Sequence, residues 1–514
     1  MTAPPAETSR GPDRKDVAHA ARSGGVQVLT ILLQAVTSAT QVVFARLFGP
    51  TLYGMYQALL AVVELGGRAA PGGADKGMLR YVAGARAIGD ADGVRRALGT
   101  GLRLGLLVSG AVSIILLVGA DAIAARLELH GAAGALRIFA LVPPFLGVLY
   151  IAIQATLAAR VTRVNFAIRG LLEPTVLLVA GLTAWALGGQ LRGLAVAHLV
   201  AAVATAALAL RALRSVFTRD ELHGVLRAPG VPGFNRFSLT MSVAEWLNVA
   251  YQRADFLILT AYVGAEGAAV YAATEFITRV IVNSRYAFDA IVAGVMAEAL
   301  QVGDHERLRQ NLQLTTRWVV TVSSLIVGVV IVLRHEILGG LYGAAYVSGA
   351  AAVVVLGVAC FINASLGLTG WILIASGRSH LTLINNFFGA AFNVVASLVL
   401  VPRLGLLGAA LAALGTIVIV QGAALVEARV LYRVLPFSGA LWKPLAAALC
   451  AFVTEALVHA AIGATLVRVV AVTGSGVVVF VGVLLAAGLP EEERHLAGKS
   501  WSRARAVLRR SPPV

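Results

Sequence analysis

Charged residues are scarce in this sequence of 514 residues: they make up 13% of it, whereas hydrophobic residues make up 58%. A soluble domain carries roughly 25% charged residues, because its surface must face water. The apolar residues fall in runs of about 20, which is the length that a helix needs to cross the hydrocarbon core of a bilayer. The mean hydropathy of +0.83 agrees with this pattern. The composition therefore excludes a soluble globular fold and predicts a membrane protein.

Cysteine is scarce too. The two cysteines, Cys360 and Cys450, both lie within apolar runs. Two such residues cannot supply a disulfide framework or a zinc site, so we interpret them as small hydrophobic residues of membrane helices. No metal and no organic cofactor is expected, and the only small ion that the sequence leaves open is a coupling H+ or Na+.

A phosphate-binding loop is missing as well. The nearest candidate is Gly498-Lys499-Ser500, but Glu493 stands where the first glycine of such a loop must be, and no strand precedes it. The loops on the predicted outer side are too short to hold a catalytic domain. We therefore expect neither an ATPase nor an enzyme.

The apolar runs predict an all-α polytopic fold with fourteen membrane spans. The first run lacks a short hydrophobic region with a cleavage site, so we expect it to be a retained helix. The predicted spans are about 24–47, 51–70, 98–119, 133–158, 166–188, 193–213, 237–262, 267–292, 313–333, 347–375, 381–401, 405–428, 440–462 and 466–488.

Most of the 42 basic residues lie in the tails and in every second loop, on one side of the predicted membrane. An excess of Arg and Lys marks the cytoplasmic side, so both termini are expected in the cytoplasm. This arrangement explains the net charge of +16 without a nucleic-acid partner. The opposite loops hold only Arg126, Arg192, Arg334 and Arg403, with Arg468 just inside the last predicted span.

The sequence also repeats itself. The segment FGPTLYGMY at 48–56 resembles VGAEGAAVY at 263–271, and six predicted spans separate the two copies, which therefore cross the membrane in the same direction. This predicts two parallel-topology six-helix lobes plus two C-terminal helices, a transporter architecture with the substrate between the halves. The residues that share an offset of 215 are Gly49 with Gly264, Tyr56 with Tyr271, and Gly193 with Gly408.

These features divide the sequence into six parts. The last of them carries apolar residues on one helical face with basic residues around it, and can either lie on anionic lipid headgroups or remain a solvated tail. The predicted parts are a cytoplasmic N-terminal tail at 1–22, an N-lobe at 23–213, a cytoplasmic linker at 214–236, a C-lobe at 237–434, helices 13 and 14 at 435–488, and a basic amphipathic cytoplasmic tail at 489–514.

Ionisable residues inside the spans mark the candidate site. Each costs about 2.5–3.5 kcal/mol at the centre of a membrane helix, so it normally faces a cavity or a partner. Polar stripes on the first two helices of each repeat predict the wall of a hydrated central cavity. The candidate substrate-binding residues are Arg68, Arg253, Arg279, Arg285, Gln34, Gln41 and Asn283. The candidates for ion coupling or charge pairing are Glu64, Glu245, Asp255, Glu275 and Asp289.

A structural role for the same charges is the alternative. Glu64 and Arg68 stand one helical turn apart, as do Glu275 and Arg279, so each acid can neutralise the arginine that follows it. His198 has no acidic neighbour in sequence, and we interpret it as a helix–helix hydrogen-bonding residue.

Two stretches resemble a known family. ARLFGPTLYGMYQALLAVVELGG…GMLRYVAGARAIGD at 45–90 resembles the opening signature of polysaccharide and oligosaccharide flippases, which belong to the multidrug/oligosaccharidyl-lipid/polysaccharide exporter superfamily. YQRADFLILTAYVGAEGAAVYAATEFITRV at 251–280 resembles the equivalent element of their second lobe. Pro71-Gly72-Gly73 departs from the family pattern, where the second helix usually continues.

The resemblance implies alternating access and a bacterial cytoplasmic (inner) membrane location. It also implies a cationic lumen that receives an undecaprenyl-pyrophosphate-linked oligosaccharide for surface polysaccharide biosynthesis. Arg253 and Asp255 match the family pattern at the seventh helix. The implied partners are the polyprenyl-pyrophosphate-linked glycan, membrane lipids and other glycan-assembly proteins.

Three other functions remain open at this point. The first is a cation-coupled multidrug or small-molecule exporter on the same fold, with Glu245, Asp255 or Glu275 as the coupling acid. The second is a non-transporting scaffold of a glycan-synthesis complex, in which the cavity charges tolerate mutation. The third is the lipid II branch of the same superfamily.

Overall fold

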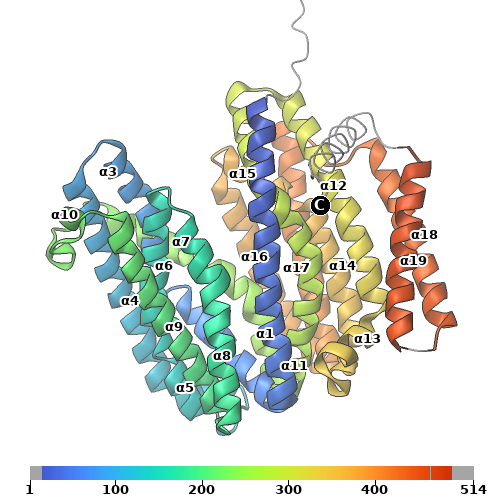
Figure 1. Cartoon of the computed structure of the whole chain (residues 1–514), viewed down its shortest axis with the longest axis horizontal. Helices are drawn as coiled ribbons and strands as arrows, with labels where there is room; N and C mark the ends of the chain where they lie inside the picture. The colour runs from blue at the N-terminus through green and yellow to red at the C-terminus, as the bar shows by residue number, and fades with distance from the viewer. Residues whose placement is uncertain (1–13, 464, 489–514) are drawn as a thin grey trace, which may run out of the picture. The chain divides into compact units, whose positions relative to one another are not determined.

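The computed structural model describes residues 14–463 and 465–488, and all regular elements in this part of the chain are helices (Figure 1). Within these described residues, eleven helical segments are long and apolar enough to cross a membrane. The all-α polytopic prediction is therefore confirmed. Residues 1–13 of the N-terminal tail predicted at 1–22, and the tail predicted at 489–514 with Gly498-Lys499-Ser500, lie outside the described residues.

The fourteen predicted spans are all found as helices. α1 (Arg14–Gly67) and α11 (Phe234–Val302) each hold two of them. The other spans correspond to α4 (Ala91–Arg126), α5 (Ala133–Phe139) with α6 (Val142–Ala158), α7 (Arg163–Asn165) with α8 (Glu173–Ala186), α9 (Gln190–Val216), α12 (His305–Val332), α14 (Ala350–Leu366) with α15 (Thr369–Ala375), α16 (Ser379–Leu404), α17 (Leu406–Tyr432), α18 (Trp442–Ala461) and α19 (Thr465–Ala486). Short helices between the spans include α2 (Ala74–Gly77), α3 (Ala83–Ala87), α10 (Arg219–Leu222) and α13 (Arg334–Ile337).

The predicted repeat is visible in the backbone. α1 kinks at Gly49 (φ 75°, ψ 171°), and α11 kinks at Gly264 (φ 83°, ψ −176°), which lies 215 positions later. Both glycines adopt a conformation that residues with a Cβ rarely reach, so each marks the turn between two spans. The next long helix in each copy begins at an aspartate, Asp90 or Asp304, whose side chain accepts a hydrogen bond from the third backbone N–H of the helix.

Equivalent positions of the two copies also touch. The Thr51 hydroxyl donates to Oε1 of Glu266 at 2.8 Å, and these residues are 215 positions apart. Close by, a Cβ on Gly54 would overlap the carbonyl oxygen of Ala265, so the backbones of α1 and α11 pack without an intervening side chain. Small residues allow such close helix packing in membrane proteins.

Contacts divide the described residues into two compact units. The first contains those up to Phe276, together with Leu341–Ala352 and Leu383–Val420. The second contains Ile277–Gly340, Val353–Thr382 and the residues from Gln421 onwards. Both units include residues of the second repeat, and the predicted lobe and linker bounds stay a prediction.

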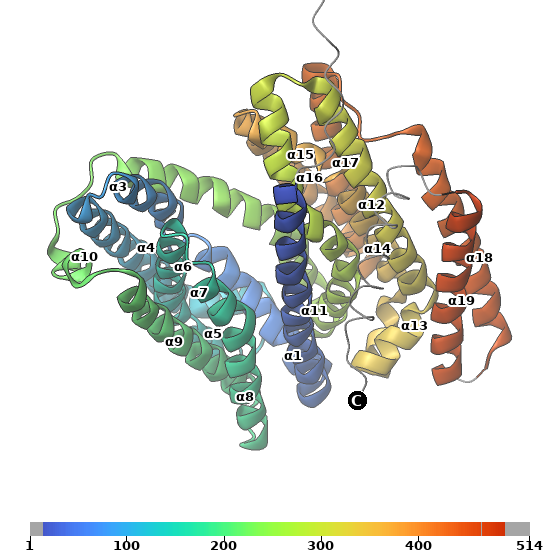
Figure 2. The same ribbon diagram turned by 45° about the horizontal axis from the view of Figure 1, so that its top comes forward.

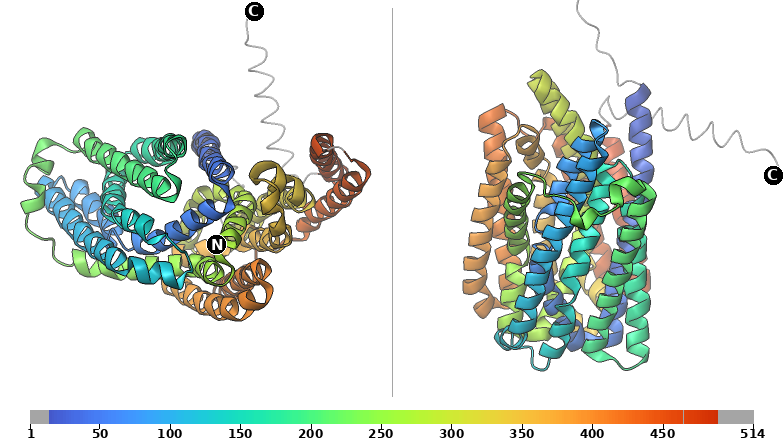
Figure 3. Two further views of the ribbon diagram at one scale, coloured as in Figure 1. Left: turned by 90° about the horizontal axis from the view of Figure 1, so that it is seen from below. Right: turned by 90° about the vertical axis from the view of Figure 1, so that its left-hand side faces the viewer.

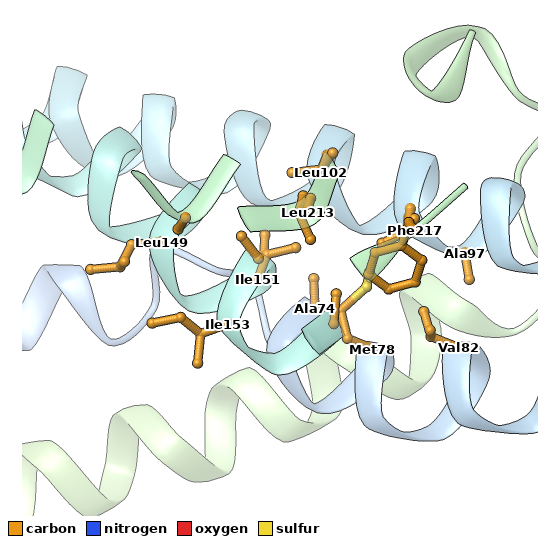
Figure 4. Packing of buried hydrophobic residues seen from close by; sticks show 14 of the residues in the cluster. Ala74, Met78, Val82, Ala97, Leu102, Leu149, Ile151, Ile153, Leu213 and Phe217 are labelled. Atoms are coloured by element: carbon orange, nitrogen blue, oxygen red, sulfur yellow. The ribbon is translucent and has the colours of Figure 1, made fainter. Parts of the chain in front are cut away.

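In the first unit, α6 packs against α4 and α9, and the three helices run side by side in Figures 1 and 2. Their core is apolar and includes Met78, Ile151, Leu213 and Phe217 (Figure 4). Each large side chain buried in this core contributes about 1.5–3 kcal/mol relative to an exposed one. This core includes Ile168, the neighbour of Arg169, and Ala74, which follows the turn that holds Arg68.

The second helix of the first repeat is broken where the sequence departs from the family pattern. α1 ends at Gly67, and a turn leads through Pro71 to α2, with positive φ at Gly72 and Gly73. A Cβ on Gly73 would overlap the carbonyl oxygen of Ser238 in α11, so glycine is required by this close approach as well as by its φ.

In the second unit, the two helices outside the repeat form a pair. α18 packs against α19 and α12, and α18 and α19 lie side by side in Figures 1 and 3. Two apolar clusters hold the pair to α12, one around Val472 and one around Phe480.

Candidate functional site

Arg253 of α11 lies between two carboxylates in the first unit. Its Nε and Nη2 each lie 2.8 Å from Oε2 of Glu64, and its Nη1 lies 3.4 Å from Oε2 of Glu275. Glu64 belongs to the first repeat, whereas Arg253 and Glu275 belong to the two spans of α11. The side chains of Glu64, Arg253 and Glu275 are 38%, 22% and 20% exposed, so the ion pairs are only partly shielded from solvent.

A buried hydrogen bond lies two residues further along the same helix. Asp255 is 4% exposed and accepts a hydrogen bond of 2.7 Å from the Tyr271 hydroxyl. In the first repeat, the amide oxygen of Gln41 accepts from the side chains of Gln57 at 2.7 Å and Tyr53 at 3.3 Å. At the offset of 215 the counterpart of Asp255 is Thr40 and not Gln41, so the two repeats build these hydrogen bonds from different positions.

A second charged pair joins the broken second helix to α11. Arg68 follows the end of α1, and its Nη1 lies 3.6 Å from Oε1 of Glu245. The guanidinium of Arg68 stands 5.8 Å from the ring centre of Tyr150, and Arg169 stands 4.7 Å from the same ring. Arg169 in turn pairs with Glu173 at 3.6 Å. Tyr150 thus has two cations within cation–π range.

We call the acids and arginines of these ion pairs, together with Asp255, the charged cluster. It contains Glu64, Arg68, Glu245, Arg253, Asp255 and Glu275. Each arginine is held by carboxylates, so an anion that binds there must compete with them. A guanidinium can exchange one planar carboxylate for a phosphate group, because both match its paired N–H donors.

Arg285 and Asp289 form a separate network in the second unit. Nη1 of Arg285 donates to both the backbone and the side-chain oxygen of Asn363, each at 3.0 Å, and Nε lies 3.4 Å from Asp289. Gln421 donates to the same Asn363 oxygen at 3.0 Å. Arg285 is only 12% exposed, and a Cβ on Gly367 would overlap its guanidinium. Its orientation is therefore fixed by Asp289 of α11 and Asn363 of α14, and Gln421 of α17 holds Asn363 in turn.

Comparison with known proteins identifies the fold. No protein-family model and no curated protein matches the sequence. A multidrug-resistance MATE family transporter of the MOP superfamily, in its inward-facing conformation, is similar over 81% of this chain and 99% of its own, with a TM-score of 0.67 at 15% identity. The lipid II flippase MurJ, in an inward closed conformation, is similar over 89% of this chain and 97% of its own, with a TM-score of 0.67 at 12% identity. The chain has the MOP-superfamily fold.

A MOP superfamily transporter from Pyrococcus furiosus, for which a binding pocket of reverse polarity is described, is a further structural neighbour. It matches 82% of this chain and 96% of its own at 16% identity, with a TM-score of 0.59. This fold agrees with the superfamily that the sequence resembles, and the expected fourteen membrane helices are confirmed.

The predicted site residues are not all brought together. Arg68 and Arg253 belong to the charged cluster of the first unit, while Arg285 and Asp289 belong to the network of the second unit. Arg279 is exposed and Asn283 half-buried on α11. Gln41 is buried in its hydrogen-bond network, and the side chain of Gln34 lies outside the described residues.

The prediction that Glu64 neutralises Arg68 through i,i+4 pairing is wrong. The helix ends at Gly67, and Arg68 turns to Glu245 while Glu64 turns to Arg253. His198 is confirmed as a helix–helix contact, because its Nδ1 lies 3.5 Å from the Tyr56 hydroxyl.

Sequence reasoning missed several polar residues. Asn363 and Gln421 are uncharged members of apolar spans, and only their position beside Arg285 reveals them. Glu336 in α13 was overlooked because it lies between spans. Its Oε1 accepts from Nη1 of Arg468 at 2.7 Å and lies 2.9 Å from Nε2 of His459.

The environment of Glu336 sets its pKa. Burial would raise the pKa of this carboxyl, but the hydrogen bonds from Arg468 and His459 outweigh burial and lower it. Glu336 therefore ties α13 to both C-terminal helices as an ionised group. Within residues 14–463 and 465–488, no group of three or more His, Cys, Asp or Glu side chains is placed to hold a metal ion.

Proposed function

We propose that the protein is a flippase that moves an undecaprenyl-pyrophosphate-linked oligosaccharide from the cytoplasmic to the outer leaflet of the bacterial inner membrane. The observation that carries the proposal is the position of Arg253, a partly exposed guanidinium held by Glu64 and Glu275 within a membrane fold. The similarity of the fold to a lipid II flippase supports it.

The charges give a mechanism for binding and release. The pyrophosphate displaces Glu64 from Arg253 and accepts the paired hydrogen bonds of the guanidinium, while Arg68 adds a second cation. When the carboxylate returns, it competes with the pyrophosphate and favours release on the other side of the membrane. An arginine suits this exchange because it stays charged in any environment.

The rest of the substrate follows from its chemistry. The sugars occupy the hydrated space between the lobes, and the polyprenyl chain stays in lipid at a lateral opening. Both termini lie in the cytoplasm, where the glycan-assembly proteins that make the lipid-linked substrate can reach the transporter. The two lobes alternate between inward and outward access.

Mass spectrometry of polyprenyl-linked glycans in a strain that lacks the gene tests the proposal. We expect a complete lipid-linked oligosaccharide to accumulate and the matching surface polymer to disappear. The same strain is complemented with wild type, Arg253→Ala, Arg253→Lys and a control, Arg137→Ala, which removes an exposed arginine paired with Asp121. Protein levels in the membrane are measured for each variant.

Wild type and Arg137→Ala are expected to export the glycan fully, Arg253→Lys partly, and Arg253→Ala almost not at all. Lysine keeps the charge but loses the paired donors, which explains its intermediate place. Full export by Arg253→Ala at a normal protein level contradicts the role of Arg253. An unchanged pool of lipid-linked glycans in the deletion strain contradicts the flippase function.

A second candidate is a cation-coupled exporter of small cationic molecules, and the charge of the cluster favours it. The cluster holds four acids, namely Glu64, Glu245, Asp255 and Glu275, against the arginines Arg68 and Arg253. An acid excess attracts cations. This candidate is supported if the deletion strain becomes more sensitive to cationic drugs while its lipid-linked glycans stay unchanged.

A further inference from the structure

A glutamate that the proposed substrate path does not use lies in the middle of α18. Glu455 is 0% exposed, and it packs where α18 meets α12 and α19. Glycines make room for it on both sides. A Cβ on Gly328 of α12 would lie 2.9 Å from its Oε2, and a Cβ on Gly476 of α19 would overlap its Oε1.

Neither carboxyl oxygen of Glu455 has a hydrogen-bond partner among the residues that the structure describes. The nearby hydroxyls do not supply one. Ser324 of α12, Thr454 of α18 and Ser475 of α19 each donate to a carbonyl of their own helix. The carboxyl is therefore enclosed by apolar and glycine surfaces.

The titratable residues of the three packed helices are directed elsewhere or lie turns away from Glu455. On α18 itself, His459 lies one turn away but faces Glu336, while Cys450 and Lys443 lie further towards the helix start. On α19 the titratable residue is Arg468, which is also bound to Glu336. On α12 the titratable residue nearest in sequence to Gly328 is Arg317, three turns away, and the others stand at the start of that helix.

An ionised carboxylate in such a place is costly, because an unpaired charge away from water loses its hydration without compensation. A neutral carboxyl with the same shape costs far less. We propose that Glu455 is a proton-binding site: it holds a proton while α18 is packed against α12 and α19, and it releases the proton to water when this packing opens.

The proton balance is simple. On binding, a carboxylate oxygen takes a proton from water on the exposed side and an O–H bond forms. On release, this bond breaks and the proton returns to water, which leaves one negative charge on Glu455. The charged form cannot return to the enclosed position, so protonation and helix packing depend on each other.

The site fits a proton better than a metal cation. Na+ requires several oxygen ligands around it, whereas the described surroundings of Glu455 offer glycines, apolar side chains and hydroxyls that are directed to their own backbones. A proton needs a single oxygen. In a transporter, such a site outside the six-helix repeats can couple a proton gradient to movement of the C-terminal helix pair; that coupling role rests on the proposed function, and proton binding itself does not.

Infrared difference spectroscopy of the full-length protein in lipid nanodiscs tests proton binding. Wild type, Glu455→Gln and Glu336→Gln are titrated from acid to alkaline pH without substrate. We expect wild type and Glu336→Gln to show the C=O stretch of a buried protonated carboxyl that disappears as the pH rises. Glu455→Gln lacks this band, since glutamine has the shape of the neutral acid but no proton to lose.

Hydrogen exchange of α18 tests the link to packing. Wild type and Glu455→Gln are compared at the same pH, so that the intrinsic pH dependence of exchange cancels. We expect equal rates at low pH, and exchange on the order of tenfold faster in wild type at high pH, because the ionised carboxyl opens the packing. Identical infrared spectra or identical exchange at every pH overturns the proposal. Neither outcome affects the flippase proposal, because no substrate is used.

Discussion

Arg253 carries the ion pairs on which the charged cluster depends, and its two carboxylate partners differ in exposure. Glu64 is 38% exposed and Glu275 is 20% exposed, so Glu64 is the partner that a ligand displaces more readily. Removing one of two partners leaves the arginine still paired. The cluster should therefore tolerate the loss of Glu64 better than the loss of Arg253, which leaves two acids without a cation.

Glu64→Gln is expected to strengthen binding of polyprenyl pyrophosphate by severalfold. The change removes the acid that competes for Arg253 and keeps the shape of the side chain. Binding is measured by native mass spectrometry on purified protein, with Asp121→Asn as the control because Asp121 belongs to an exposed pair. Equal or weaker binding by Glu64→Gln contradicts direct competition at Arg253.

The second prediction at this scale concerns pH. The pKa of Glu336 is lowered in the folded protein, so its contribution is fully present above the ordinary glutamate pKa of about 4.3 and is lost as the pH falls through the lowered value. Thermal unfolding in detergent should show a loss of stability in acid that Glu336→Gln abolishes. At neutral pH, this variant should cost about 1–3 kcal/mol, because the bonds from Arg468 and His459 are weakened.

An exposed pair provides the comparison. Glu306 pairs with Arg309 at the start of α12, where water screens the interaction. Glu306→Gln should leave the unfolding temperature at neutral pH unchanged. If Glu336→Gln behaves in the same way, the bonds that join α13 to α18 and α19 contribute nothing to stability.

At the scale of the helices, the apolar runs were sufficient to predict the spans, since twenty apolar residues leave the chain no other way to satisfy its backbone in lipid. The partners of the charges were not predictable, because they depend on how helices distant in sequence pack. Arg253 and Glu64 are 189 positions apart. Glu455 is visible in the sequence as a lone acid in an apolar span, but burial and missing partners distinguish it only in the structure.

Helix packing at the repeat gives a prediction at this scale. Gly54→Ala should destabilise the protein by about 1–3 kcal/mol, because its Cβ meets the backbone of Ala265, which cannot move aside as a flexible side chain does. The control is Gly110→Ala in α4, where a Cβ meets nothing within 4 Å. That variant should gain up to about 1 kcal/mol from helix propensity. Thermal unfolding of both variants in the same detergent shows whether Gly54→Ala lowers and Gly110→Ala raises the stability.

At the scale of the whole molecule, the charge asymmetry of the loops predicts the orientation in the membrane. Alkaline phosphatase fused at Gly131, between α4 and α5, should be active, because this loop is expected outside. The same enzyme fused at Val161, between α6 and α7, should be inactive, since this loop is expected in the cytoplasm with Arg160 and Arg163. The reverse pattern of activity contradicts cytoplasmic termini.

The contact between Thr51 and Glu266 bears on how such a chain can arise. Where two copies of one segment meet at corresponding positions, two separate but identical chains would place the same residue on both sides, a threonine against a threonine or a glutamate against a glutamate. Two facing glutamates repel each other. Once the copies are joined in a single gene, each half can mutate independently, and a donor can come to face an acceptor. The same freedom allows an acid, Asp255, in one half and a threonine, Thr40, at the corresponding position of the other. Gene fusion thus gives a duplicated protein the asymmetry that a homodimer cannot encode.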